Sequence, residues 1–195
     1  ALVGVNNVKV TGNATTAREL ASLQTYVATN TSRAGTGTNP STTGSFGDGV
    51  TAGTDGTQRV FTEAMLESVI DSIFTSSGEM ADTILVGAFN KRKMNGFTGR
   101  ATTTDHRANE NSIISAADVY KSDYGDLKIV PDVFSRARDA IVYKKDKWAL
   151  AELRPLNSKE IAATGDAEKR QMLMEVTLEA RNEHSSGIVA DLTTS

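Results

Sequence analysis

The chain has 195 residues, with 21 Lys and Arg against 24 Asp and Glu, and its formal net charge is −3. Because it has no Cys and only two His, His106 and His184, the sequence excludes disulfide scaffolds, thiol nucleophiles and thiolate or histidine metal cages. The net negative charge argues against a generally basic surface that binds nucleic acid. No stretch approaches the roughly 20 consecutive apolar residues of a membrane span, and no charged signal-peptide segment opens the chain, so we expect a soluble protein without a targeting segment.

The N-terminal part predicts one helix followed by a long loop. Thr16, with Glu19 three residues later, forms a capping-box pattern, and the apolar stripe that follows predicts a helix ending near residue 30. Residues 31–58 then hold seven Gly, eight Thr and one Pro. Loops of this length are uncommon in compact domains, so this loop is expected to be disordered, functional or ordered by a neighbouring subunit, and we favour the neighbour.

The middle of the chain alternates helices and strands. Apolar residues at helical spacing predict a helix over residues 62–78, and a buried strand is expected at 83–87, before a short basic helix around 90–94. Two β-rich runs, 117–122 and 127–130, flank a turn with glycine and predict a hairpin.

The C-terminal part is rich in strands. Residues 140–143 and 148–153 predict a second strand pair, which a charged turn joins and Arg154-Pro155 closes. Apolar residues at alternate positions over 172–180 predict a long, half-buried strand, and 188–190 a short one. The predicted class is therefore α+β, with mostly antiparallel sheets and a few helices.

No motif indicates catalysis or cofactor binding. The glycine-rich stretch 44–50 lacks the Lys-Ser or Lys-Thr pair of a P-loop and the strand–turn–helix setting of a dinucleotide site. No Gly-x-Ser-x-Gly elbow is present, and both His lie in polar stretches. We therefore expect no catalytic residues, no cofactor, no metal and no enzyme activity.

Two charged clusters leave alternatives open. Asp118, Asp123 and Asp126 surround the predicted hairpin turn and could bind a cation or serve as an acid–base pair, so an enzyme acting through Asp123 is the least favoured reading. Turn aspartates more often hydrogen-bond their own backbone. The basic run 91–93 could contact phosphates, although a solvated helix face or an intersubunit ion-pair surface fits it better.

The chain resembles a known family over most of its length. The motifs that carry the resemblance are residues 117–120, 122–125, 127–131, 148–149, 153–155, 164–171, 179–183 and 186–192, with 55–58, 85–87 and 97–100 upstream. They are similar to the major head proteins of tailed bacteriophages of the SU-ten type, whose members share the Hong Kong ninety-seven-like capsid fold. Because the motifs occur in order along the chain, the resemblance is specific.

The resemblance implies a structural virion protein without a catalytic role. Many copies would form the pentamers and hexamers of an icosahedral shell around the DNA genome, assembled in the cytoplasm of the bacterial host. Expected partners are further copies of the chain, with other capsid, portal or decoration proteins, and DNA only non-specifically on the inner face; no membrane is involved. The alternative is an encapsulin-like shell or another virion structural protein, because a shared fold does not fix the cargo.

The family pattern also suggests a domain division and contact residues. Residues 1–60 would be part of the peripheral domain with the long Gly/Thr loop, 61–165 mainly the axial domain, and 166–195 a return to the peripheral domain. Family members usually have a longer N-terminal part, so roughly the first third is expected to be missing here. The intersubunit contact candidates within the motifs are Arg154, Arg170, Arg181 and Glu183.

Overall fold

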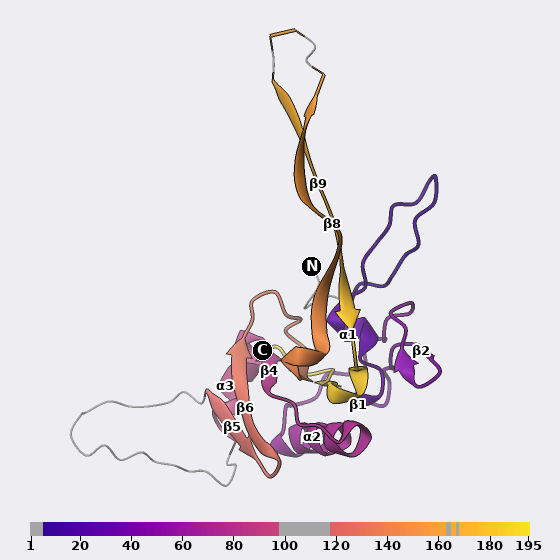
Figure 1. Cartoon of the computed structure of the whole chain (residues 1–195). Coiled ribbons are helices and arrows are strands. Elements are labelled where there is room, and N and C mark those ends of the chain that lie inside the picture. Colours follow the sequence, from indigo (N-terminus) through magenta and orange to yellow (C-terminus); the bar gives the residue numbers. More distant parts are fainter. Residues whose placement is uncertain (1–5, 98–117, 163–164, 167) are drawn as a thin grey trace, which may run out of the picture.

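The computed structural model describes residues 6–97, 118–162, 165–166 and 168–195. It consists of a body built on one large sheet and a two-stranded arm that projects from the body (Figure 1). The arm is formed by β8 (Trp148–Ile161) and β9 (Lys169–Ala180). The other elements are α1 (Leu23–Tyr26), β1 (Asn30–Ser32), β2 (Thr42–Thr43), β3 (Phe46–Gly47), α2 (Glu63–Ser77), β4 (Thr83–Val86), α3 (Ala88–Met94), β5 (Val119–Ser122), β6 (Gly125–Pro131), β7 (Ala140–Tyr143), η1 (Lys145–Lys147), η2 (Glu183–Ser185) and β10 (Gly187–Val189).

The helix α2 forms where the sequence predicts one. Thr62 precedes it in extended backbone, and its apolar stripe is buried against the sheet. Gly78 ends the helix at φ 66°, where its N–H donates to the carbonyl oxygen of Phe74 at 2.9 Å. The buried residues of the stripe are Leu66, Val69, Ile70 and Ile73.

Six strands form the sheet of the body, in the order β1–β10–β7–β4–β6–β5. The pairs β1/β10 and β4/β6 are parallel, and the other three pairs are antiparallel. The last strand, β10, lies between β7 and the first strand, β1, so strands from opposite ends of the element order are neighbours in the sheet. The predicted mixed class, with mostly sheet and few helices, is confirmed.

Central strands of the sheet are buried on both faces, as a doubly covered sheet requires. Along β4, Ile84 and Val86 pack toward α2, whereas Leu85 packs into a second cluster on the other face. The second cluster includes Val27 and Ile188, and the base of the arm covers it. Each side of the sheet therefore has its own core.

The predicted helix over residues 16–30 is wrong for most of its length. Val10 and Glu19 form an antiparallel backbone bridge, so Glu19 does not cap a helix. The side-chain oxygen of Asn13 accepts the backbone N–H of Thr16 at 2.8 Å, which holds this segment in a turn. A single helical turn, α1, remains, and Val27 follows it in extended backbone.

The second strand pair is also wrong in its pairing, although both strands exist. β7 pairs with β4 and β10, whereas β8 pairs with β9. Pro155 does not end the strand: β8 continues to Ile161, with register irregularities on either side of Arg154. The predicted hairpin of β5 and β6 is confirmed, with Gly125 at φ 144° after its turn.

Contacts within the chain order the Gly/Thr loop over residues 31–58. The carboxylate of Asp191 is fully buried and accepts the backbone N–H groups of Ala34 at 3.1 Å and Gly56 at 2.7 Å. Arg138 approaches the same carboxylate at 3.2 Å. Contacts within the chain thus hold the loop at several points, and its contact with a neighbouring subunit stays a prediction.

A second carboxylate links this loop to the segment before β7. Asp55, in the loop, accepts two hydrogen bonds of 2.7 Å from Arg136 and one of 3.2 Å from Arg138. The Arg136 bond, with the charges of Arg136 and Arg138, holds the pKa of Asp55 below its usual value, although partial burial of the carboxyl acts in the opposite direction. The loop and the segment 136–139 are therefore one charged network.

We predict that Asp191→Asn lowers the free energy of unfolding by about 1.5–3 kcal/mol, because a buried charged acceptor loses its charge while Arg138 stays in place. The matched control, Asp55→Asn, removes the same charge from a side chain that is 40% exposed and should cost less than about 1 kcal/mol. Urea denaturation of both variants and the unsubstituted protein measures the difference. Equal losses in the two variants would contradict this account.

A further prediction concerns pH. Asp139 is 2% exposed, and burial raises the pKa of its carboxyl despite the Arg136 guanidinium at 3.4 Å. Because its pKa is higher in the folded state, its contribution to stability is fully present below the ordinary value of about 3.8 and declines as pH rises through the raised pKa. Between pH 3 and 7, the stability of the unsubstituted protein should therefore fall relative to Asp139→Asn as pH rises. Thermal melts of the two proteins at each pH measure this difference. A difference in melting temperature that stays constant from pH 3 to 7 would refute the role of Asp139.

Candidate assembly surface

The arm projects from the body, and its base is the part that packs on the core. Its strands pair from Trp148 opposite Ala180 to Ile161 opposite Lys169. At about 3.3 Å per residue, the 14 residues of β8 reach roughly 45 Å. Figure 1 shows that the outer part of the arm stands clear of the body.

The base of the arm is fixed in the core of the body. The indole N–H of Trp148 donates to the hydroxyl oxygen of Ser186 at 2.9 Å, and its ring lies 6.3 Å from that of Tyr26. Trp148 and Leu178 both pack on the second hydrophobic cluster. The arm therefore begins from a rigid anchor, and its direction is set by the sheet beneath it.

One face of the arm is apolar and exposed. Alternate residues of β9 point to the same face, which places Met172, Met174, Val176 and Leu178 together. Leu156 lies nearby on β8, in the stretch of irregular register between Arg154 and Asn157. Met172 is 72% and Leu156 66% exposed. The predicted long strand is thus confirmed in extent, but it is more exposed than the half-buried strand that we expected.

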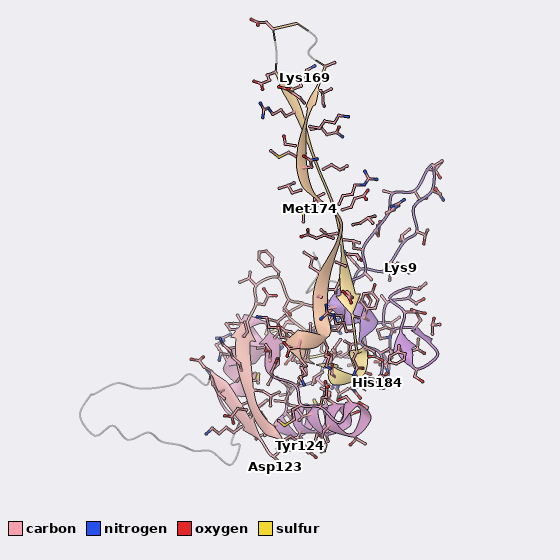
Figure 2. All side chains as sticks on the ribbon, viewed as in Figure 1. Lys9, Asp123, Tyr124, Lys169, Met174 and His184 are labelled. Atoms are coloured by element: carbon pink, nitrogen blue, oxygen red, sulfur yellow. The ribbon has the colours of Figure 1, made fainter. Side chains whose placement is uncertain are left out.

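The side chains of the arm extend into solvent along its whole outer length (Figure 2). The opposite face carries mostly polar residues, among them Gln171, Glu175 and Thr177. Soluble proteins rarely leave a continuous apolar strip of this kind uncovered unless it contacts another molecule. The apolar face of β9 and its neighbours on β8 is therefore the leading candidate for an interface.

Three of the four predicted contact residues lie on the arm or directly after it. Arg154 pairs with Glu175 across the strands at 3.1 Å, and Arg170 contacts Glu168 at 2.6 Å. Arg181 approaches Glu179 at 3.3 Å. Their side chains are between 55% and 61% exposed.

The fourth residue, Glu183, has a different environment. It is 3% exposed, and its carboxylate accepts hydrogen bonds from the hydroxyl of Thr29 and from the backbone N–H of Ala28. Those bonds join the segment after β9 to the segment before β1. Whether any of the four residues contacts another subunit stays a prediction.

A groove that the sequence did not reveal runs beside the arm. It has a volume of about 630 Å³ and lies between the arm and the segment that ends at Leu20. Leu153, Met174 and Val176 form its apolar wall, and the charged residues Arg18, Glu152 and Glu175 also line it. The alternation of apolar residues along β9 indicates Met174 and Val176 in the sequence. The position of Leu153 could not be predicted, because the register of β8 is irregular around Arg154.

The basic run 91–93 and one aspartate of the acidic cluster make contacts inside the chain. Asp118 pairs with Lys91 at 3.2 Å, and Arg92 and Lys93 lie over the ring of Phe89 at 5.6 and 5.3 Å. Within residues 6–97, 118–162, 165–166 and 168–195, no group of three or more His, Asp or Glu is arranged to hold a metal ion.

An acidic hollow of about 230 Å³ lies between α2 and the β5–β6 hairpin. The hydroxyl of Tyr120 donates to Glu63 at 3.2 Å and to Glu67 at 3.5 Å. Burial, reinforced by these carboxylates, raises the pKa of Tyr120, so the phenol keeps its proton.

Among the helices of the described residues, none is long and apolar enough to cross a membrane.

Comparison with known proteins identifies the family to which the chain belongs. The family model described as SU10 major capsid protein matches residues 3–193. No curated protein matches the chain. Because the family match spans nearly the whole sequence and agrees with the motifs, the chain belongs to the SU10 major capsid protein family.

Proposed function

We propose that the protein is the major head subunit of a tailed bacteriophage, and that its copies form the pentamers and hexamers of an icosahedral shell around the DNA genome. Membership of a capsid protein family implies a structural virion protein that associates with itself. We further infer a Hong Kong ninety-seven-like arrangement of body and arm. The exposed apolar face of the arm is the observation that carries this proposal.

The energetics of the arm favour burial against another subunit. A two-stranded hairpin is marginally stable in water unless a further layer covers one of its faces. Here the base is covered by the core, whereas Met172, Leu156 and Leu153 are 66–76% exposed. Burial of apolar surface yields about 25 cal/mol per Å², so covering this face in an assembly stabilises both the arm and the contact.

Charge contributes less than the apolar face. The ion pairs of Arg154 and Arg170 are solvent-exposed, and pairs of this kind are worth about 0–1 kcal/mol each. A shell can still use such contacts, because symmetry repeats each of them in every copy. The four predicted contact residues would then adjust the geometry of neighbours rather than supply most of the binding energy.

The proposed domain division places residues 61–165 mainly in the axial domain and the rest in the peripheral domain. The first strand, β1, and the last strand, β10, both belong to the sheet of the body. We therefore propose one revision of this division: the axial body would include β1 and β10, and the arm, with both β8 and β9, would be the peripheral element. The cores on the two faces of the sheet support treating the body as one unit.

Other copies of the chain are the main partners in this proposal, with portal or decoration proteins as further ones. DNA would meet the inner face without sequence recognition, and because such contact depends on cations, a chain with a net charge of −3 would bind it only weakly. Assembly would take place in the cytoplasm of the bacterial host.

The test is electron microscopy combined with mass photometry on the purified chain over a range of concentrations. We expect capsomer rings or closed shells, with Met172→Ser raising the concentration needed for assembly by roughly tenfold because it removes an exposed apolar contact. The matched control is Gln171→Ser, which changes the adjacent residue on the opposite, polar face and should assemble normally.

Two results would contradict the proposal. A chain that stays monomeric at every concentration would contradict self-assembly, and equal effects of Met172→Ser and Gln171→Ser would contradict the role of the apolar face. Particles formed in the phage host that hold protein cargo and lack DNA would favour the encapsulin-like alternative.

A further inference from the structure

The most exposed large apolar side chains of the described residues lie on a short loop of the body, between β6 and β7. Val133 is 94% and Phe134 78% exposed. We call these two residues the apolar tip. They fill no groove of their own chain, because side chains seated in a groove would be buried.

The segment that carries the apolar tip is held at both ends. Before it, the backbone N–H of Asp132 donates to the Val86 carbonyl oxygen at 3.0 Å, and the Asp132 carboxylate accepts the N–H of Phe134 at 2.9 Å. After it, Arg136 is bound through two hydrogen bonds to Asp55. A segment that is ordered before binding loses little conformational entropy when it binds.

The side chain of Asn90 fixes the same segment from α3. Its amide nitrogen donates to the carbonyl oxygen of Ala137 at 2.8 Å. The neighbouring Ser135 is 8% exposed, so the chain turns inward directly after the tip. The structure therefore holds two apolar side chains in solvent on a well-supported loop, which is the usual form of an interface anchor.

The groove beside the arm has the properties of a matching receptor. Its volume of about 630 Å³ falls in the range of sites that enclose small ligands, which is ample for one aromatic and one branched side chain. Met174 supplies an adaptable wall and a sulfur atom suited to contact with an aromatic ring. Leu153, at 76% exposure, has no cover in the single chain.

We propose that the apolar tip of one subunit inserts into the groove beside the arm of a neighbouring subunit. This inference rests on the proposed function, since it needs a second copy of the chain as the occupant. It assigns Phe134 as the main anchor, Met174 and Leu153 as its receptor, and the contact as one that joins two different surfaces.

Charge complementarity supports this choice of occupant. Asp132 directly precedes the tip, and Arg18 lines the groove together with Glu152 and Glu175. Because Glu175 is already paired with Arg154, Arg18 is the cation that Asp132 would meet on insertion. Every copy carries both the tip and the groove, so each subunit can bind one neighbour and be bound by another. Such head-to-tail contacts close into rings when the rotation between subunits is right, as pentamers and hexamers require.

The absence of Cys from the chain makes a direct test possible. Two single variants, Phe134→Cys and Met174→Cys, are mixed before assembly and treated with a short bis-maleimide. We expect covalent dimers that contain one copy of each variant, identified by mass. The matched control replaces Met174→Cys with Gln171→Cys, on the opposite face of the arm, and should give no such dimers.

The same experiment separates this inference from the proposed function. Particles that form without the mixed dimer would overturn the tip contact and leave the shell proposal standing. Dimers of Met174→Cys with itself would also overturn it, because they mean that two arms pack on each other. A lack of dimers, together with a lack of particles from the unsubstituted protein, would contradict the two proposals together.

A second pair of variants measures the size of the effect. Phe134→Ser should raise the concentration required for assembly by at least about tenfold, whereas Val50→Ser, at another exposed apolar position, should not change it. Both sites are exposed, so unfolding curves of the isolated variants should match that of the unsubstituted protein. Normal assembly of Phe134→Ser would refute the role of Phe134 as the main anchor of the contact.

Discussion

The buried carboxylate of Asp191 has to be satisfied inside the protein, and three distant segments supply its partners. Ala34 and Gly56 donate from the two ends of the Gly/Thr loop, and Arg138 approaches from the segment before β7. A buried charge without such partners would destabilise the fold by several kcal/mol. A loop with almost no apolar residues thereby gains a fixed path, because charged hydrogen bonds replace the hydrophobic core that its sequence cannot form.

The arm follows a different physical rule from the body. In the body, strands such as β4 bury side chains on both faces, so the sheet is stable by itself. Only the base of the arm shares that core, through Trp148 and Leu178. Beyond the base, backbone hydrogen bonds between β8 and β9 maintain its shape, and one apolar face remains for another molecule.

Local patterns in the sequence predicted the elements whose stability is local, and missed those decided by distant contacts. The apolar stripe and Gly78 define α2 in any setting, and the turn at Gly125 defines the β5–β6 hairpin. The capping box at Thr16 failed because Glu19 is taken by its bridge to Val10. Local patterns could not predict the partner of β8, because β9 pairs with it from residues further along the chain. The groove could not be predicted either, because its lining combines both strands with Leu20 from the N-terminal part.

The interior of the body also determines how the subunit presents its surface. Arg136 and Arg138 lie two and four residues after the apolar tip, and both are bound by Asp55, while Arg138 also reaches Asp191. The tip is therefore positioned by the same network that orders the Gly/Thr loop. The direction of the arm is set by Trp148, which packs on the second hydrophobic cluster. In a symmetric assembly, an error in the angle between two contact surfaces is repeated at every copy, so it prevents closure even when each contact is strong. A subunit of this kind gains more from rigid connections between its contact surfaces than from a higher affinity at any one of them, and the buried charges of the body provide such connections.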